Sequence, residues 1–148
     1  MSTPTPAELT AYVRSVIPII DAMGLEIVEA GRNEVAARLP FAPNKNHFGA
    51  SYAGSLFTVA EVLGGIFAST SMTLEGAVPL VKRVEIDFRR PATTDVVSRT
   101  RLEDDEIARV LAETAERGKS DFQLQTELTD EAGTVVATTL GFYQLRKF

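Results

Sequence analysis

Hydrophobic and polar side chains follow several different periods along the chain, and each period predicts one kind of element. The stretch 5–24 has apolar side chains at helical spacing, with Thr5 as a helix cap and Gly24 as a stop signal. Pro18 interrupts this stretch, and we expect it to kink the helix or to end it early. Residues 1–24 are therefore predicted to form a helical segment that leads into the rest of the fold.

Six other stretches have the two-residue alternation or the flanking turn signals that are typical of strands. In the clearest of them Val84, Ile86 and Phe88 share one face, and charged side chains share the other. A stretch with helical period at 104–119 precedes the last two predicted strands. It has acidic residues at its start and basic residues at its end, as the helix dipole favours. The predicted strands are 25–30, 34–40, 79–92, 94–103, 120–130 and 134–148.

A helix that is apolar nearly all round is predicted at about 53–73, after a loop rich in Pro, Asn and Gly. Such helices are buried in the core of a fold. We therefore expect the α+β class, with an antiparallel six-stranded sheet wrapped around this central helix. The 148 residues suit one domain, 1–148. A sheet of this size leaves an edge or a face for a second copy, so a homodimer is expected.

Composition narrows the classes of function. Hydrophobic residues make up 45% of the chain and the net charge is −5, which argues against nucleic acid or an anionic membrane as the main partner. With no Cys and one His, we expect neither thiolate catalysis nor a metal site. No secretory signal pattern is visible, and the apolar run 51–72 is interrupted by an acid and a Gly pair. A cytoplasmic protein without a membrane span is therefore expected.

Glu61 is the only formal charge between Asn46 and Met72. A carboxylate on a buried helix is costly to desolvate, so its presence needs a reason. Three interpretations are open: an ion pair with Lys82, a solvated cleft or subunit interface, or a catalytic acid, base or nucleophile. If Glu61 is desolvated, its pKa should be raised, and a pairing with Lys82 would oppose that shift.

The loop before the central helix offers further candidates. The first N–H groups of a helix lack partners, and small residues at Ala53 and Gly54 would let a ligand carbonyl approach them. The alternative is that Gly54 only allows a tight turn. Asn46 is either a turn residue or an amide that orients water or substrate. A lone histidine such as His47 is most often a surface residue.

These residues match a known pattern. Asn46 and Gly49 fit an Asn-x-x-Gly motif, Tyr52-Ala53-Gly54 lies where His-Gly-Gly is expected, and Glu61 falls at the position of a helix acid. The segments VEIDFRRPA and LTDEAGTVVATT resemble the strand and closing hairpin that follow. The chain resembles the hotdog-fold acyl-CoA thioesterases of the phenylacetyl-CoA type, and its sequence is most similar to the branch labelled DUF4442.

The resemblance implies a hotdog fold, assembly as a homodimer or homotetramer, and hydrolysis of acyl-CoA at the dimer interface. It implies that the N–H groups of Ala53 and Gly54 form the oxyanion hole, that Glu61 is the base or nucleophile, and that Asn46 positions water. Coenzyme A enters only as part of the substrate, without a separate cofactor. The residues expected to contact substrate are His47, Gly49, Tyr52, Lys82, Arg89 and Arg90, with Arg117 and Lys119 as further basic candidates for the phosphates.

Two other functions are open. A hydroxyacyl-thioester dehydratase of the same fold pairs a His with a helix Glu, and His47 and Glu61 fit that spacing loosely. This mechanism needs His47 as its general base. A non-catalytic acyl-CoA or fatty-acyl binding protein is compatible with Tyr52, which stands where the thioesterases have histidine.

Overall fold

The strands form one antiparallel sheet in the computed structural model, which describes residues 2–148. The strand order is β1-β2-β4-β5-β6-β3, so β1 and β3 are the two edges. The predicted antiparallel six-stranded sheet is therefore confirmed, and the strands follow the predicted order along the chain. Their bounds are β1 (Glu26–Ala30), β2 (Glu34–Leu39), β3 (Ala77–Phe88), β4 (Val96–Arg101), β5 (Lys119–Thr129) and β6 (Val135–Lys147).

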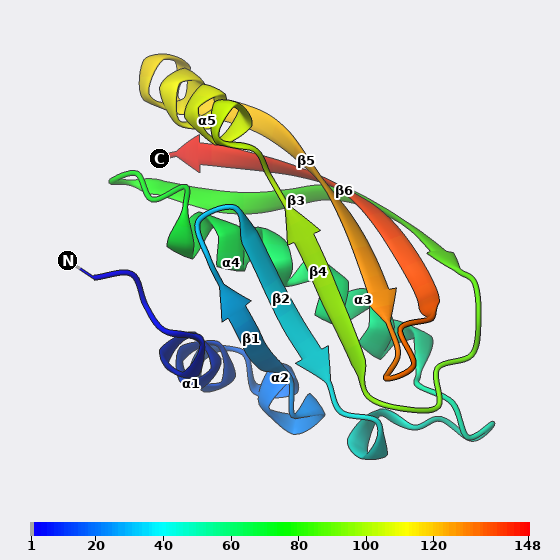
Figure 1. Cartoon of the computed structure of the whole chain (residues 1–148). Helices are drawn as coiled ribbons and strands as arrows, with labels where there is room; N and C mark the ends of the chain where they lie inside the picture. Colours follow the sequence, from blue (N-terminus) through cyan, green and yellow to red (C-terminus); the bar gives the residue numbers. More distant parts are fainter. Residues whose placement is uncertain (1) are drawn as a thin grey trace.

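The central helix lies along the inner face of the curved sheet, and α5 packs near the C-terminal end of β6 (Figure 1). The central helix consists of α3 and α4, which are separated by a break at Val62. It ends at Thr70 rather than near residue 73. The sheet wraps around it as predicted. The helix bounds are α1 (Pro6–Val16), α2 (Pro18–Met23), the 3-10 turn η1 (Ala42–Asn44), α3 (Ala53–Glu61), α4 (Leu63–Thr70) and α5 (Asp104–Arg117).

The core lies between the central helix and the sheet. Val59, Leu63 and Phe67 of the helix are fully buried there, with Leu124 and Leu128 of β5 among the side chains opposite. Within the described residues one helix, Ala53–Thr70, is long and apolar enough to cross a membrane, and 56% of it is buried inside the fold. The core helix of a globular domain has the same profile.

The break at Val62 coincides with two hydroxyl groups that the sheet presents to the helix. Ser98 of β4 donates to the Val59 carbonyl at 2.6 Å, and Tyr143 of β6 donates to the Glu61 carbonyl at 3.2 Å. Both carbonyls lie in the turn where a regular helix would use them for its own hydrogen bonds. The sheet thus holds the helix at its interruption.

The N-terminal helices cover one edge of the sheet. The backbone N–H of Ile27 in β1 donates to the Thr10 hydroxyl of α1 at 2.9 Å. Arg14 of α1 donates from Nε to the Leu25 carbonyl and from Nη2 to the Gly24 carbonyl, both at 2.9 Å. Side chains of α1 therefore bond the backbone of β1 and of the two residues before it. The predicted interruption at Pro18 is confirmed, because α1 ends and α2 begins there.

The opposite edge is β3, which has 12 residues and pairs only with β6 among the described residues. None of its side chains is buried, and Val81 and Phe88 are 49% and 52% exposed. The predicted face formed by Val84, Ile86 and Phe88 is therefore only half-covered in a single chain. A long edge strand of this kind, with unpaired backbone groups, is a template for pairing with another strand.

Candidate active site

The N-terminus of α3 presents free backbone donors. Tyr52 is the N-cap residue, with an extended backbone and no capping bond from its side chain. Its carbonyl accepts from the N–H groups of Ser55 and Leu56 at 3.0 and 3.1 Å. Among the described residues nothing accepts from the N–H groups of Ala53 and Gly54, so both are available to an oxygen atom of a ligand.

A hollow of about 530 Å³ opens at this helix start. Its lining includes Asn46 and Ser51 of the loop, Ala53 and Leu56 of α3, and residues 88–92 after β3. Apolar side chains form much of the wall, and two arginines, Arg89 and Arg90, belong to the last segment. An apolar hollow with a few polar groups is the usual form of a small-molecule site.

Asn46 has the structural role that its residue type predicts, and it also lines the hollow. Its Oδ1 accepts from the N–H of Phe48 at 2.9 Å and from the N–H of Ala50 at 3.2 Å. Gly49 closes the same turn with φ of 80°, a conformation that favours glycine. The carboxamide nitrogen of Asn46 is therefore the part of its side chain that is left for a ligand.

Ser51 is a residue that the sequence did not single out. It is only 6% exposed, it lines the hollow, and its Oγ has no hydrogen-bond partner within residues 2–148. Its N–H donates to the Ala92 carbonyl at 2.8 Å, which fixes the serine between the loop and the segment after β3. No periodicity or motif marks one serine among the small residues of this loop.

Tyr52 and Gly54 are packed against each other. A Cβ atom at Gly54 would lie 2.5 Å from Cε2 of the Tyr52 ring, which is too close for any other residue unless the ring moves. A larger residue at position 54 would therefore displace the Tyr52 ring from its present place over the helix start. The ring itself is 59% exposed and could be covered by a ligand or a second copy.

Glu61 ends α3 on the same helix face as Gly54, two turns further on. Its side chain is half-buried and has no ion-pair or hydrogen-bond partner among the described residues. Burial raises the pKa of this carboxyl above its usual range, as the sequence predicted for a desolvated group. A raised pKa makes the Glu61 carboxylate a stronger base than an ordinary glutamate.

The ion pair between Lys82 and Glu61, one of the three interpretations of Glu61, is not formed. Lys82 Nζ lies 3.0 Å from Oδ2 of Asp121 on β5, and both side chains are largely exposed. The reason is a β-bulge between Val81 and Arg83, which breaks the alternation that would have turned Lys82 inward. Lys82 therefore leaves Glu61 without a counter-ion.

Tyr143 of β6 lies beside the helix break. Its ring is buried, stacks on Phe122 with 5.5 Å between centroids, and fits against two glycines. A Cβ atom at Gly64 or Gly141 would come within 2.2 or 2.4 Å of the ring. Burial and the nearby Glu61 carboxylate raise the pKa of Tyr143, so its hydroxyl stays protonated and can only donate to the Glu61 carbonyl.

The basic candidates for the phosphates fall into two groups. Arg89 and Arg90 line the hollow at the helix start, whereas Arg117 and Lys119 line a separate depression together with Lys82. His47 is exposed and packs on the neighbouring Phe48 ring, with 4.0 Å between centroids. It is not among the residues that line the hollow.

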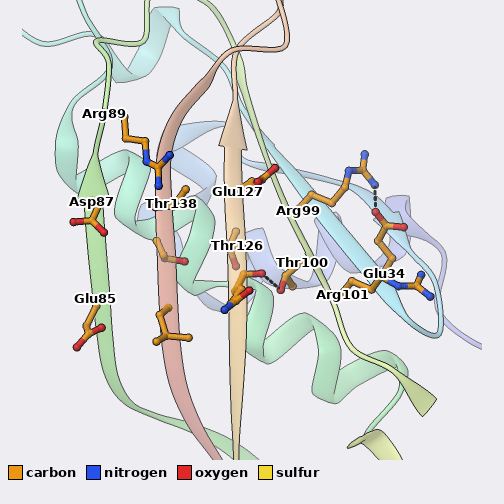
Figure 2. A pocket seen from close by; sticks show the side chains of 13 residues that line it. Glu34, Glu85, Asp87, Arg89, Arg99, Thr100, Arg101, Thr126, Glu127 and Thr138 are labelled. Carbon is orange, nitrogen blue, oxygen red and sulfur yellow. Dashed lines mark hydrogen bonds and ion pairs between the residues drawn. The ribbon is translucent and has the colours of Figure 1, made fainter. Parts of the chain in front are cut away.

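A second hollow of about 550 Å³ lies over the outer face of the sheet (Figure 2). Charged side chains of several strands border it, and some already pair with one another. Arg99 bonds Glu34 at 3.1 Å and also bonds Glu29, while Arg101 bonds Glu103 at 3.3 Å. These exposed pairs lack the free helix donors and the apolar wall of the smaller hollow, which we therefore regard as the candidate site.

An antiparallel sheet around an apolar helix, with free donors at the helix start and an acid further along, is the arrangement expected of hotdog thioesterases. The chain matches the family described as "Putative thioesterase (yiiD_Cterm)" over residues 6–147 and belongs to that family. The protein is thus a thioesterase of hotdog fold. The DUF4442 branch inferred from the sequence is compatible with this family and stays a prediction.

Solved structures share this fold. A protein of Pseudomonas aeruginosa described as a probable thioesterase is 39% identical, with 99% of each chain covered and a TM-score of 0.89. A Shewanella oneidensis protein described as a "putative thioesterase" is 21% identical, with 97% of each chain covered and a TM-score of 0.81. A Haemophilus influenzae thioesterase is 17% identical, with 99% of this chain and 93% of that chain covered and a TM-score of 0.77. A comparison with curated proteins gave no match.

Proposed function

We propose that the protein hydrolyses an acyl-CoA thioester to a carboxylic acid and free CoA, at a site that two copies of the chain build together. The observation that carries the proposal is the half-buried Glu61. It has a raised pKa and no counter-ion among the described residues, on a helix whose first N–H groups are free. A structural carboxylate would be expected to have a partner.

In the proposed reaction, water adds to the thioester carbonyl carbon while the Glu61 carboxylate accepts a proton from that water. The carbonyl oxygen becomes an oxyanion, which the N–H groups of Ala53 and Gly54 stabilise. The C–S bond then breaks with its electron pair going to sulfur, and the proton held by Glu61 passes to the thiolate. Asn46 contributes its carboxamide nitrogen to the water or substrate.

Two copies are needed because the donors and the acid of one chain are separated. Gly54 and Glu61 lie seven residues apart, which corresponds to about 10 Å along a helix. Glu61 is also not among the residues that line the hollow at the helix start. We therefore assign the donors and the acid that act on one thioester to different copies.

The surfaces that a second copy would cover are apolar. Phe57, on the exposed stripe of α3 between Gly54 and Glu61, is 37% exposed, and Val81 and Phe88 lie along the unpaired edge of β3. Pairing of two β3 edges would bury these side chains and satisfy the free backbone groups. This supports a homodimer as the active unit and leaves a tetramer to be tested.

The substrate class follows from the wall of the hollow. Phe48, Leu56 and Phe88 supply an apolar surface for an acyl or aryl group, and Arg89 and Arg90 supply positive charge for the phosphates of CoA. The overall charge of −5 makes these two arginines a local basic site on an acidic protein.

A distant relative offers one point of support for Asn46 and Glu61. In a Staphylococcus aureus thioesterase that is 13% identical, a glutamine and a glutamate fifteen positions apart have each been replaced by alanine in separate crystal structures. Asn46 and Glu61 are also fifteen positions apart. The dehydratase alternative gains no such support, and His47 is not among the residues that line the hollow.

The test is release of free thiol from a panel of acyl-CoA thioesters with short, medium, long and aromatic acyl groups. We expect turnover by the unmodified protein, loss of at least about 100-fold in Glu61→Gln, and little change in His47→Ala. A dehydratase would instead release no thiol, because it leaves the C–S bond intact; it would convert a hydroxyacyl-CoA to an enoyl-CoA and lose that activity in both variants. Tight binding of acyl-CoA without thiol release from any member of the panel would favour the non-catalytic binding protein.

A further inference from the structure

Ser51 has a feature that the proposed function does not use. Its hydroxyl is buried and has no partner within residues 2–148, and the residue is one of those that line the candidate site. Buried hydroxyls nearly always have a hydrogen-bond partner, because a buried polar group without one destabilises the folded state. The other buried serines at the sheet have partners: Ser98 donates to Val59, and Ser120 donates to Glu113.

The surroundings of Ser51 hold it rigidly in place. Its N–H bonds the Ala92 carbonyl at 2.8 Å, and the residue forms an isolated antiparallel bridge with Lys45. The next residue, Tyr52, donates its N–H to the Asn44 carbonyl at 2.7 Å. Backbone hydrogen bonds therefore hold the chain on both sides of this hydroxyl.

The hydroxyl also lies close in sequence to the free donors of α3. Ser51 and Ala53 line the same hollow and are separated only by the N-cap residue Tyr52. An oxygen atom that enters the hollow to accept from the helix N–H groups would thus meet a third donor from the loop. A hydroxyl carried on a hydrogen-bonded backbone is well suited to this task, because the main chain needs no reorganisation when charge develops on that oxygen.

We propose that the Ser51 hydroxyl donates to the thioester carbonyl oxygen and completes the oxyanion hole formed with Ala53 and Gly54. This assignment rests on the proposed function, since it names a further catalytic residue for the same hydrolysis. The hydroxyl stays intact throughout: it forms no covalent bond and gives up no proton. Its unmet bond in the free protein is satisfied when the oxyanion forms.

The proposal predicts opposite effects on stability and on activity. Ser51→Ala removes a buried group that has no partner, so the melting temperature should stay equal or rise. The same change should lower kcat on the order of 100-fold, as expected for one oxyanion donor, with KM nearly unchanged. Ser51→Thr, which keeps a hydroxyl, should recover a substantial part of kcat.

Ser98→Ala is the matched control, because it removes a buried hydroxyl that has a partner at 2.6 Å. It should lower the melting temperature. Retained kcat in Ser51→Ala would overturn the assignment and leave the proposed function standing. A raised KM at constant kcat, or a loss of stability like that of Ser98→Ala, would also overturn it. If the unmodified protein releases no thiol from any acyl-CoA, the proposed function fails, and the role of Ser51 fails with it.

Discussion

The hydroxyl of Tyr143 donates to the backbone carbonyl of Glu61 at 3.2 Å, and this bond ties β6 to the interruption of the central helix. The carboxylate itself is not engaged. The tyrosine therefore holds the main chain from which the acid projects, while the acid remains free to accept a proton. The two residues are 82 positions apart in sequence.

We predict that Tyr143→Phe lowers the free energy of unfolding by about 1 kcal/mol, because the buried Glu61 carbonyl loses its partner while the ring is kept. Thiol release should fall several-fold through less exact placement of Glu61. Chemical denaturation and steady-state kinetics would measure the two effects. Tyr12→Phe is the control, since Tyr12 is 62% exposed and should change neither. Unaltered kcat in Tyr143→Phe would show that the bond does not position the acid.

Gly64→Ala should destabilise the protein by about 1–3 kcal/mol, because the new methyl group would lie 2.2 Å from the buried Tyr143 ring. Gly65→Ala provides a matched comparison on the next residue of α4. Apart from the adjacent residues and the helix's own backbone, no described atom lies within 4 Å of a Cβ there, so this change should stabilise the helix by up to about 1 kcal/mol. Equal effects of the two changes on the melting temperature would contradict this packing.

Glu61→Gln should stabilise the protein at neutral pH and have no effect under acidic conditions. The raised pKa means that the folded state binds the Glu61 proton more tightly than the unfolded state does. Stability due to this group is thus present below the ordinary pKa of a glutamate and is lost as the pH rises through the raised pKa. Melting temperatures at pH 4 and pH 8 would show a gap of a few degrees that opens only at the higher pH.

An exposed carboxylate gives the control for that experiment. Glu116→Gln on the outer face of α5 should leave the melting temperature unchanged at both pH values. A gap of the same size at pH 4 and pH 8 for Glu61→Gln would point to a packing effect instead of a proton-linked one.

The rate of hydrolysis should rise with pH as Glu61 loses its proton. Because burial raises the pKa of Glu61, the midpoint of the rise in kcat/KM should lie above 4.5, the ordinary value for this group. Replacing Glu61 with Asp shortens the acid and should reduce kcat while the profile keeps a single rising limb. A rate that is flat across this range in the unmodified enzyme would argue against Glu61 as the base.

If the active unit is the proposed dimer, Val81→Lys should give a monomer of 16.1 kDa and abolish thiol release, because it replaces an exposed apolar side chain on the unpaired edge strand β3 with a charge. Sedimentation velocity and the thiol assay would measure both. Gln123→Lys adds the same charge to an exposed position of the inner strand β5 and should change neither. An active monomer in the first variant would contradict a site shared between copies.

Much of the fold could be predicted because it depends on local periodicity. In β5, buried and exposed side chains alternate from Lys119 to Leu128, and this two-residue period is visible in the sequence. The N-terminal helix was equally clear, since Thr5 and Glu8 form the capping box that their spacing indicates. Such patterns arise because one face of each helix or strand is buried, and they do not depend on which other element covers that face.

The features that were missed depend on contacts between distant residues. The bulge that turns Lys82 toward Asp121 is a property of the pairing between β3 and β6, and no local pattern reveals it. The break at Val62 is held by hydroxyls from two strands that follow much later in the chain. Ser51 stands out only through the absence of a partner, which becomes visible once the whole loop is placed.

The side chains of Thr10 and Arg14 hydrogen-bond to backbone groups of β1 and of the two residues before it. These bonds limit which edge of the sheet can pair with another copy. With that border of the sheet already occupied by α1, only the β3 border can accept another strand. Two copies that pair through β3 form one continuous sheet whose two outer edges are both covered by α1. Extension of the sheet by strand pairing therefore stops at two copies. A sheet with both borders open would instead add copies without end and form a fibre.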